Sequence, residues 1–242
     1  LMNFINRITK LLKLIKNKTW RKGVFNNIAA NIELEDLIKD LEVEIVIDVG
    51  SNKGQFLLLT ENFFECKKIY SFEPIEEFFE MQKNFFKYKN NISFFNFALG
   101  EKTTKNTFYI TKRKDSSSFF KINESIKSND DYKIIEKKEI QIHSLDDIMI
   151  NENLNGTTLL KIDVQGYELE VLKGSIETLK KIKYIIAEIS DNEIYKNQSS
   201  SHNVINFLEN NNFTFYRENK SSKIKKSNFT QKDVLFVNKI NL

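Results

Sequence analysis

The sequence predicts an α/β fold built on a mainly parallel sheet of about seven strands, with helices on both faces and an antiparallel hairpin at its carboxyl end. From residue 44 onward, short apolar runs alternate with helical segments, which is the pattern of repeated βαβ units. Several of these runs end in an acid or a glycine turn, as strands do at the ligand edge of such a sheet. The chain has only seven glycines and one proline, and most of them fall in these turns.

The apolar runs and their connections define the expected elements. Strands are predicted at 44–49, 68–73, 92–97, 158–163 and 183–189. Connecting helices are predicted at 54–64, 75–88 and 168–181. A last helix over 201–211 precedes strands at 213–217 and 234–238, which we expect to pair as the antiparallel hairpin at a sheet edge.

The amino-terminal segment differs from the rest of the chain in charge. Residues 1–22 carry seven lysines and arginines and no acid, which leaves −3 for the remainder of a chain whose net charge is +4. We expect a basic lead-in over 1–40 and one α/β domain over 41–242. Apolar side chains in 1–17 share one helical face, namely Phe4, Ile5, Ile8, Leu11, Leu12 and Ile15. Packing of this face on the domain is the preferred interpretation, and attachment of residues 1–22 to an anionic membrane or a partner is the alternative.

Composition narrows the class of protein. With 40% hydrophobic and 29% charged residues, the chain is typical of soluble globular proteins. Cys66 is the only cysteine, which excludes an internal disulfide, and no Cys/His cluster indicates zinc. No apolar run reaches the roughly 18 to 20 residues of a transmembrane helix. We expect a cytoplasmic protein that touches the inner membrane face only if residues 1–22 bind lipid, with no nucleic acid as partner.

Residues 103–143 interrupt the βαβ rhythm and are predicted to form an insertion that faces the substrate. Two strand-like runs, 104–110 and 139–143, enclose a serine run and a charged stretch. Long excursions from compact α/β domains are commonly lids or binding loops, although a solvated loop is an equal alternative for 124–138. The candidate acceptor-binding residues are Ser116, Ser117, Ser118, Phe119 and Tyr167, with Phe120 and Tyr132 as further lining candidates.

The first predicted strand runs into a glycine turn. It ends in Asp48-Val49-Gly50, and Gly54 follows before a helix, giving G-x-x-x-G. This turn lacks the glycines of G-x-G-x-x-G and of a P-loop, which disfavours a pyrophosphate or phosphate ligand. S-adenosylmethionine is a ligand that suits it, with an ammonium group for an acid and a carboxylate for backbone N–H groups. By itself the turn is weak evidence, since any tight strand-to-helix turn favours glycine.

The next two strands end in residues that suit a nucleoside. Glu73 lies 25 residues after Asp48, where an acid accepts hydrogen bonds from ribose hydroxyls, as it does in nicotinamide-dependent enzymes. A helix-capping acid beside Pro74 is the structural alternative. Ala98 and Gly100 follow the third strand and leave room for a flat base, or simply end the strand.

The fourth strand ends in Asp163, an acid emerging from a buried strand. Isolated buried carboxylates are costly, so a partner is expected. Contact with a ligand, or a role as base, is as well supported as a salt bridge to Lys161 or Lys173.

Read in order, these motifs resemble the FkbM family of class I S-adenosylmethionine-dependent methyltransferases. The matching stretches are DVGSNKGQF, SFEP, NFALG, SLDD, KIDVQGYELEVLKG and IIAEI, which span about residues 44–190. Gln165 departs from the pattern, because the family usually has glutamate in its D-V-E-G motif.

The resemblance implies a Rossmann-like fold with S-adenosylmethionine on the DVGSNKGQF loop and Glu73 at its ribose. It also implies methyl transfer to a hydroxyl of a sugar, a surface glycan precursor or another small molecule. The residues expected to bind the cofactor are Asp48, Gly50, Ser51, Asn52, Gly54, Gln55, Phe56, Glu73, Pro74, Asn96, Ala98 and Leu99.

A hydroxyl acceptor must lose its proton, and a nearby base helps. Asp163 is the first candidate, and His143, the only histidine of the core region, is the second because histidine titrates near neutrality. An exposed strand residue is the alternative for His143. No metal is predicted, although Asp163 with Asp146 or Asp147 has suitable ligand chemistry.

Two rival functions use the same residues differently. A nicotinamide-dependent oxidoreductase would also employ Glu73, but the absent G-x-G-x-x-G disfavours it. A non-catalytic glycan-binding or membrane-associated protein of the same fold would employ the basic helix.

Overall fold

The computed structural model describes residues 2–126, 129–220, 222–223 and 229–240. Its main sheet has the order β10-β11-β8-β7-β1-β2-β3, and β9 also pairs with β11. The strands are β1 (Ile45–Val49), β2 (Lys68–Phe72), β3 (Ile92–Phe95), β7 (Thr158–Ile162), β8 (Tyr184–Ser190), β9 (Phe213–Glu218), β10 (Ser222–Lys223) and β11 (Thr230–Asn238). The strands from β8 to β3 are parallel, whereas β11 is antiparallel to β8, β9 and β10. The predicted α/β class, the parallel sheet and the antiparallel carboxyl-terminal strands are confirmed.

The strand order reverses beside β1, and this determines where a ligand binds. The chain passes from β1 to β2 and β3 on one side, and later adds β7 and β8 on the other. Loops that follow β1 and its two neighbours therefore diverge and leave a crevice at their carboxyl ends.

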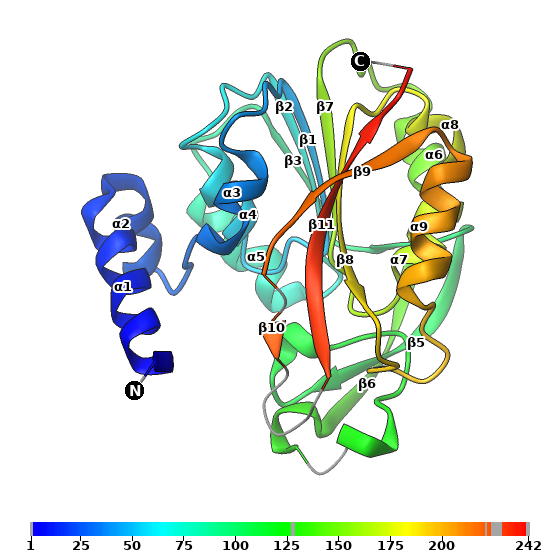
Figure 1. Ribbon diagram of the computed structural model, residues 1–242, viewed down its shortest axis with the longest axis horizontal. Helices are drawn as coiled ribbons and strands as arrows, with labels where there is room; N and C mark the ends of the chain where they lie inside the picture. The colour runs from blue at the N-terminus through cyan, green and yellow to red at the C-terminus, as the bar shows by residue number, and fades with distance from the viewer. Residues whose placement is uncertain (1, 127–128, 221, 224–228, 241–242) are drawn as a thin grey trace.

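Helices cover both faces of this sheet (Figure 1). One side carries α3 (Glu35–Ile38), α4 (Gln55–Thr60) and α5 (Glu76–Phe85), and the other carries α6 (Leu145–Met149), α7 (Glu168–Lys173), α8 (Ile176–Leu179) and α9 (Ser201–Asn210). Alternate residues of β1 enter separate cores, since Ile47 packs with Val171 and Leu208, and Val46 packs with Leu57. Coverage on both faces explains why β1 is a continuous apolar run.

The single helix predicted at 168–181 is two helices, α7 and α8, so that prediction is wrong at the turn between them. A Cβ atom on Gly174 would lie 2.0 Å from the carbonyl oxygen of Gly100, so the backbones of the two segments touch there. The chain turns at Gly174 and Ser175 before α8 begins. The predicted helices at 54–64 and 75–88 are also shorter than expected, as α4 and α5 show.

The insertion forms a second sheet. Its strands β5 (Thr104–Thr111) and β6 (Ile134–His143) are antiparallel, and β6 also pairs in parallel with β4 (Ala98–Leu99). Because β6 begins at Ile134, the loop alternative for 124–138 is wrong for residues 134–138, which lie in β6 and pair with β5 except at a bulge. Short 3₁₀ turns connect the two strands at Lys114–Ser116, Glu124–Ile126 and Asp130–Tyr132. This second sheet lies below the carboxyl ends of the parallel strands in Figure 1.

The amino-terminal segment contains α1 (Met2–Lys16) and α2 (Lys18–Phe25), followed by a 3₁₀ turn at Ile32–Leu34. Trp20 of α2 is buried and its indole nitrogen donates to the carbonyl oxygen of Leu58 at 3.1 Å. Residues between 14 and 38 share the core that contains Val46, and the boundary near residue 40 stays a prediction.

The predicted packing of α1 is wrong, because a different face of this helix lies against the domain. The predicted apolar face is exposed at Ile8, Leu11, Leu12 and Ile15, and Leu14 is the buried residue instead. The side chains of Phe4 and Ile5 lie outside the described residues. No helix in the described part of the chain is long and apolar enough to cross a membrane.

Candidate active site

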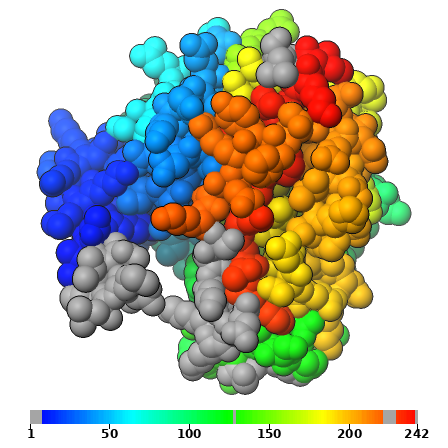
Figure 2. Space-filling model, in the orientation of Figure 1, coloured from blue at the N-terminus to red at the C-terminus, as the bar shows by residue number. Residues whose placement is uncertain are grey.

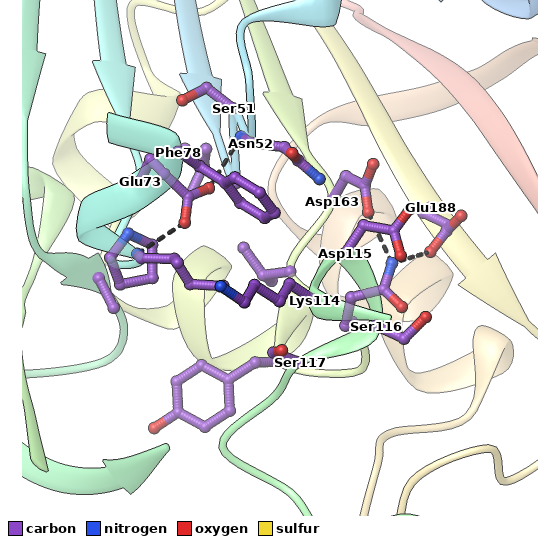
Figure 3. A pocket seen from close by; sticks show the side chains of 18 of the residues that line it. Ser51, Asn52, Glu73, Phe78, Lys114, Asp115, Ser116, Ser117, Asp163 and Glu188 are labelled. Carbon is purple, nitrogen blue, oxygen red and sulfur yellow. Dashed lines mark hydrogen bonds between the residues drawn. The ribbon is translucent and has the colours of Figure 1, made fainter. Parts of the chain in front are cut away.

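A cavity of about 390 Å³ lies at the carboxyl ends of β1, β2, β7 and β8, between the main sheet and the insertion. Glu73 lies on one side and Asp163 and Glu188 on the other (Figure 3). The predicted site residues that line it are Gly50, Ser51, Asn52, Gln55, Phe56, Glu73, Pro74, Ala98, Leu99, Ser116, Ser117, Phe119, Asp163 and Tyr167. The predicted residues outside its lining are Asp48, Gly54, Asn96, Ser118, Phe120 and His143, whereas the further candidate Tyr132 lines it.

The loop after β1 is held tightly against its neighbours. Gly50 has a φ of +77°, and a Cβ atom there would lie 2.0 Å from the carbonyl oxygen of Asp163. The backbone N–H groups of Gly50 and Ser51 both donate to the carbonyl oxygen of Phe72 at 3.0 Å. These two N–H groups therefore bind the end of β2, whereas the side-chain oxygen of Asn52 is buried and has no hydrogen-bond partner among the described residues.

Glu73 is fixed at the end of β2 by the backbone. Its Oε2 accepts from the N–H of Asn52 at 2.8 Å, and its Oε1 accepts from the N–H of Ile75 at 2.7 Å. Burial raises the pKa of the Glu73 carboxyl to about 7, against the two backbone hydrogen bonds that favour its charged form. Each carboxylate oxygen still has a second lone pair for a ligand hydroxyl.

Gln82 of α5 supports this loop and was not predicted from the sequence. Its side-chain nitrogen donates to Ser51 Oγ at 2.9 Å and to the carbonyl oxygen of Asn52 at 3.1 Å. Its side-chain oxygen accepts from Ser71 Oγ at 2.6 Å. Gln82 is fully buried. The feature of the sequence that could have revealed its role is a polar residue on the inward face of a predicted helix.

Lys161 joins two acids, one behind the cavity and one facing it. Its Nζ lies 3.5 Å from Asp48 Oδ1 and 3.2 Å from Asp163 Oδ2. Although burial opposes its charge, Asp163 and Asp48 raise the pKa of the Lys161 ammonium group. Asp48 is fully buried, and burial raises the pKa of its carboxyl to about 6. Asp163 thus has both of the predicted features, a salt bridge to Lys161 and access to the cavity.

Gln165 connects Asp163 to β8. Its amide nitrogen donates to Asp163 Oδ1 at 2.9 Å and to Glu188 Oε2 at 3.1 Å. Its amide oxygen accepts from the Tyr195 hydroxyl at 2.8 Å, which fixes the orientation of the amide. Burial, followed by the nearby Asp163, raises the pKa of the Glu188 carboxyl well above its usual range. Gln231 of β11 completes this network by donating to Glu188 Oε1.

The insertion covers the cavity with polar and aromatic side chains. Arg113 and Asp115 line it as an ion pair, with Nε 2.7 Å from Oδ1, and were not predicted as site residues. The rings of Phe119 and Tyr167 are 4.9 Å apart. Lys114 forms an ion pair with Glu77 of α5 and thereby ties the insertion to the main domain.

Other predicted residues support the site from outside its lining. Ser118 Oγ donates to the carbonyl oxygen of Gln165 at 2.7 Å, and the Asn96 amide donates to that of Glu73 at 2.9 Å. A Cβ atom on Gly54, whose φ is +84°, would lie 2.8 Å from the Phe86 ring. The structure does not bring His143 to the cavity, since its ring packs edge-on against Phe97 at 4.5 Å.

Two of the acids that face the cavity, Glu73 and Asp163, stand on either side of β1. Glu73 follows β2 and Asp163 follows β7, which places them about two strand spacings, or roughly 10 Å, apart. Among the described residues, no group of three or more His, Cys, Asp or Glu side chains is arranged to hold a metal ion. This geometry suits an elongated ligand with hydroxyls at one end and a reacting group at the other.

Comparison with known proteins agrees with the motif resemblance. Residues 48–215 match the profile of the methyltransferase FkbM domain. The 2-O-methyltransferase NoeI of Sinorhizobium fredii is 35% identical over 69 residues, which are 28% of this chain and 28% of NoeI.

A crystal structure with a TM-score above 0.5 shows a similar fold. A methyltransferase FkbM crystal structure from Methylobacillus flagellatus KT has a TM-score of 0.53 and 13% identity, covering 98% of this chain and 60% of that chain. Magnesium protoporphyrin IX methyltransferase from Synechocystis PCC 6803, with bound S-adenosylmethionine, has a TM-score of 0.47 and 11% identity, covering 92% and 84% respectively. This chain spans less than two thirds of the length of NoeI and of the M. flagellatus protein.

Proposed function

Because this chain belongs to the FkbM family of S-adenosylmethionine-dependent methyltransferases, we propose that it transfers the methyl group of that cofactor to a hydroxyl of a sugar, in a glycan or glycan precursor. The observation that carries the proposal is the position of Asp163, a half-buried carboxylate that faces the cavity across from Glu73. The nicotinamide alternative is not retained, since the family is one of methyltransferases.

The residues around the β1 loop fit the cofactor. Glu73 would accept hydrogen bonds from the ribose hydroxyls, with Ala98 and Leu99 beside the adenine. The buried Asn52 Oδ1, for which the described residues offer no hydrogen-bond partner, would accept from the cofactor ammonium group. Because Gly50 has no Cβ atom, the loop after β1 can approach the backbone of Asp163 closely, and Asn52 and Asp163 line the same cavity.

Asp163 is proposed as the general base. The cofactor supplies an electrophilic methyl group on a sulfonium. Asp163 accepts the proton of the acceptor hydroxyl as the oxygen–methyl bond forms and the methyl–sulfur bond breaks. Lys161 and Gln165 each hold one oxygen of this carboxylate, so its direction is fixed before the acceptor arrives.

The insertion is proposed to bind the sugar. Arg113, Asp115 and Ser117 offer donors and acceptors for several hydroxyls, and Phe119 and Tyr167 offer apolar ring faces. The partial similarity to NoeI, a 2-O-methyltransferase, supports a hydroxyl oxygen as the acceptor atom.

A single-turnover assay tests the base. Asp163→Asn should slow transfer to a sugar acceptor by about 10² to 10⁴-fold, while S-adenosylhomocysteine still binds within about threefold by calorimetry. His143→Gln is the matched control and should transfer at the wild-type rate. Wild-type transfer by Asp163→Asn would exclude Asp163 as the base. Cofactor binding without transfer to any hydroxyl acceptor would favour the non-catalytic alternative.

The acceptor class is tested by mass spectrometry. The enzyme and its cofactor are incubated with isolated cell-surface glycans, nucleotide sugars and simple phenols. We expect a mass increase of one methyl group on a sugar-containing acceptor. Methylation of phenols alone would overturn the sugar proposal while leaving the methyltransferase activity intact.

A further inference from the structure

Helix α1 docks on the domain through one face and leaves its apolar face uncovered. Lys10 and Lys13 form ion pairs with Glu33 and Glu35, and Leu14 is buried. Residues 10, 13 and 14 recur at helical spacing, so they make up one side of the helix. The side of α1 that carries Lys10, Lys13 and Leu14 therefore faces the domain.

The opposite side of α1 is an apolar stripe. Ile8, Leu11, Leu12 and Ile15 are 40–54% exposed, and their spacing also follows one helical face. Four adjacent large aliphatic side chains on one helix are more than the scattered exposure expected of an ordinary surface. Figure 2 shows the amino-terminal helices as a lobe at the edge of the molecule, where a flat partner can reach them.

The charges around the stripe indicate what covers it. No acid occurs in residues 1–22. Lys16, Lys18, Arg21 and Lys22 are all exposed on α1 and α2, in addition to the two lysines that bind the domain. Long basic side chains beside an apolar stripe reach upward to lipid phosphates while the aliphatic side chains enter the acyl boundary.

We propose that α1 and the basic residues of α2 bind an anionic lipid surface, with the stripe of Ile8, Leu11, Leu12 and Ile15 inserted at the interface. Fifteen residues make a helix about 22 Å long, which suits a helix lying in the membrane plane. The ion pairs to Glu33 and Glu35 hold the helix in place, so the stripe is presented without rearrangement. Binding of α1 to a lipid surface does not depend on which molecule accepts the methyl group. It can therefore be tested without measuring catalysis.

Vesicle flotation of the full chain tests this proposal. The protein should float with vesicles of phosphatidylcholine mixed with phosphatidylglycerol, and binding should weaken at high salt. Leu11→Gln/Leu12→Gln should weaken binding at least about tenfold. Lys16→Gln/Lys18→Gln should weaken it by about fivefold or more, because each basic residue near an anionic surface contributes. All four residues are exposed, so these variants should keep the circular dichroism spectrum of the wild type.

Ile150→Gln/Phe215→Gln is the matched control, since both side chains are exposed and apolar but lie elsewhere. It should float as the wild type does. No flotation with anionic vesicles, equal flotation with phosphatidylcholine alone, or unchanged flotation of Leu11→Gln/Leu12→Gln would each overturn the proposal. A dimer in sedimentation velocity that Leu11→Gln/Leu12→Gln dissociates, without vesicle binding, would assign the stripe to a second copy of the chain and also overturn it.

Discussion

The Gln165 amide nitrogen lies 2.9 Å from Asp163 Oδ1 and places a neutral donor where an acid is usual in the family. The same nitrogen reaches Glu188, and Tyr195 holds the amide oxygen. A neutral amide can bridge two carboxylates, whereas a third carboxylate would repel both. Gln165 is therefore a positioning residue for Asp163.

Gln165→Glu should add negative charge beside Asp163 and Glu188 without changing size. We expect the acid limb of the single-turnover pH profile to move upward by about one pH unit, because a like charge favours protonation of its neighbours. Transfer at a pH on the acid limb should slow by roughly tenfold, whereas the plateau rate should change little.

Gln165→Met separates charge from hydrogen bonding, since it removes the donor but adds no acid. It should slow transfer while moving the acid limb less than Gln165→Glu does. Identical pH profiles for the two variants would mean that packing at this position, rather than charge, is what matters.

Cofactor affinity should depend on the ionisation of Glu73. Burial raises the pKa of its carboxyl to about 7, so the carboxylate proposed to accept the ribose hydroxyls becomes predominant only above that pH. We expect S-adenosylhomocysteine to bind about tenfold more tightly at pH 8 than at pH 6, in proportion to the ionised fraction. Calorimetry of Glu73→Gln should show weaker binding of S-adenosylhomocysteine with little dependence on pH. If the affinity of this variant still changes with pH, another group is responsible.

The stability of the ligand-free protein should fall as the pH rises. Burial raises the carboxyl pKa of Asp48 and Asp233 to about 6, and that of Glu73 and Glu168 to about 7. Because these folded-state values exceed the unfolded ones, the folded state holds more protons in this window, and stability is lost as the acids ionise. Urea unfolding should give a lower free energy at about pH 8 than at about pH 5.

Glu73→Gln removes one of these ionisations and should flatten that dependence. If Glu73→Gln keeps the wild-type slope of unfolding free energy against pH, the groups that ionise in this window are the other acids. A free energy of unfolding that rises between about pH 5 and pH 8 would contradict the raised pKa values altogether.

Gly174→Ala should destabilise the fold. The new Cβ atom would lie 2.0 Å from the carbonyl oxygen of Gly100, and neither backbone segment can move without disturbing α7 or the start of the insertion. A loss of about 2 to 3 kcal/mol in unfolding free energy is expected from overpacking of this kind. Equal stability of Gly174→Ala and the wild type would disprove the close contact.

The sheet could be predicted closely because its strands are continuous apolar runs. The strand predicted at 44–49 corresponds to β1 at Ile45–Val49, and covering helices on both faces produce that pattern. Glu73 and Asp163 were found for the same reason, since an acid directly after a buried strand is conspicuous.

The network around Gln165 could not be predicted. Gln165 meets Glu188 because β7 pairs with β8, and Gln231 meets Glu188 because β11 pairs with β8. No local pattern encodes these side-chain contacts. Periodicity likewise showed an apolar stripe on α1 but not which side docks, because the ion pairs of Lys10 and Lys13 with the domain depend on the tertiary fold.

The position of β11 has a consequence for synthesis of the chain. β11 lies between β8 and β9, although it follows both in sequence. Until residues 230–238 leave the ribosome, a nascent chain carries β8 with an open edge, and Glu188 lacks its Gln231 partner. An apolar strand with an unpaired edge is a site of aggregation. Translation that stalls before residue 230 should therefore yield insoluble chains, and the site is completed only when the last strand is inserted.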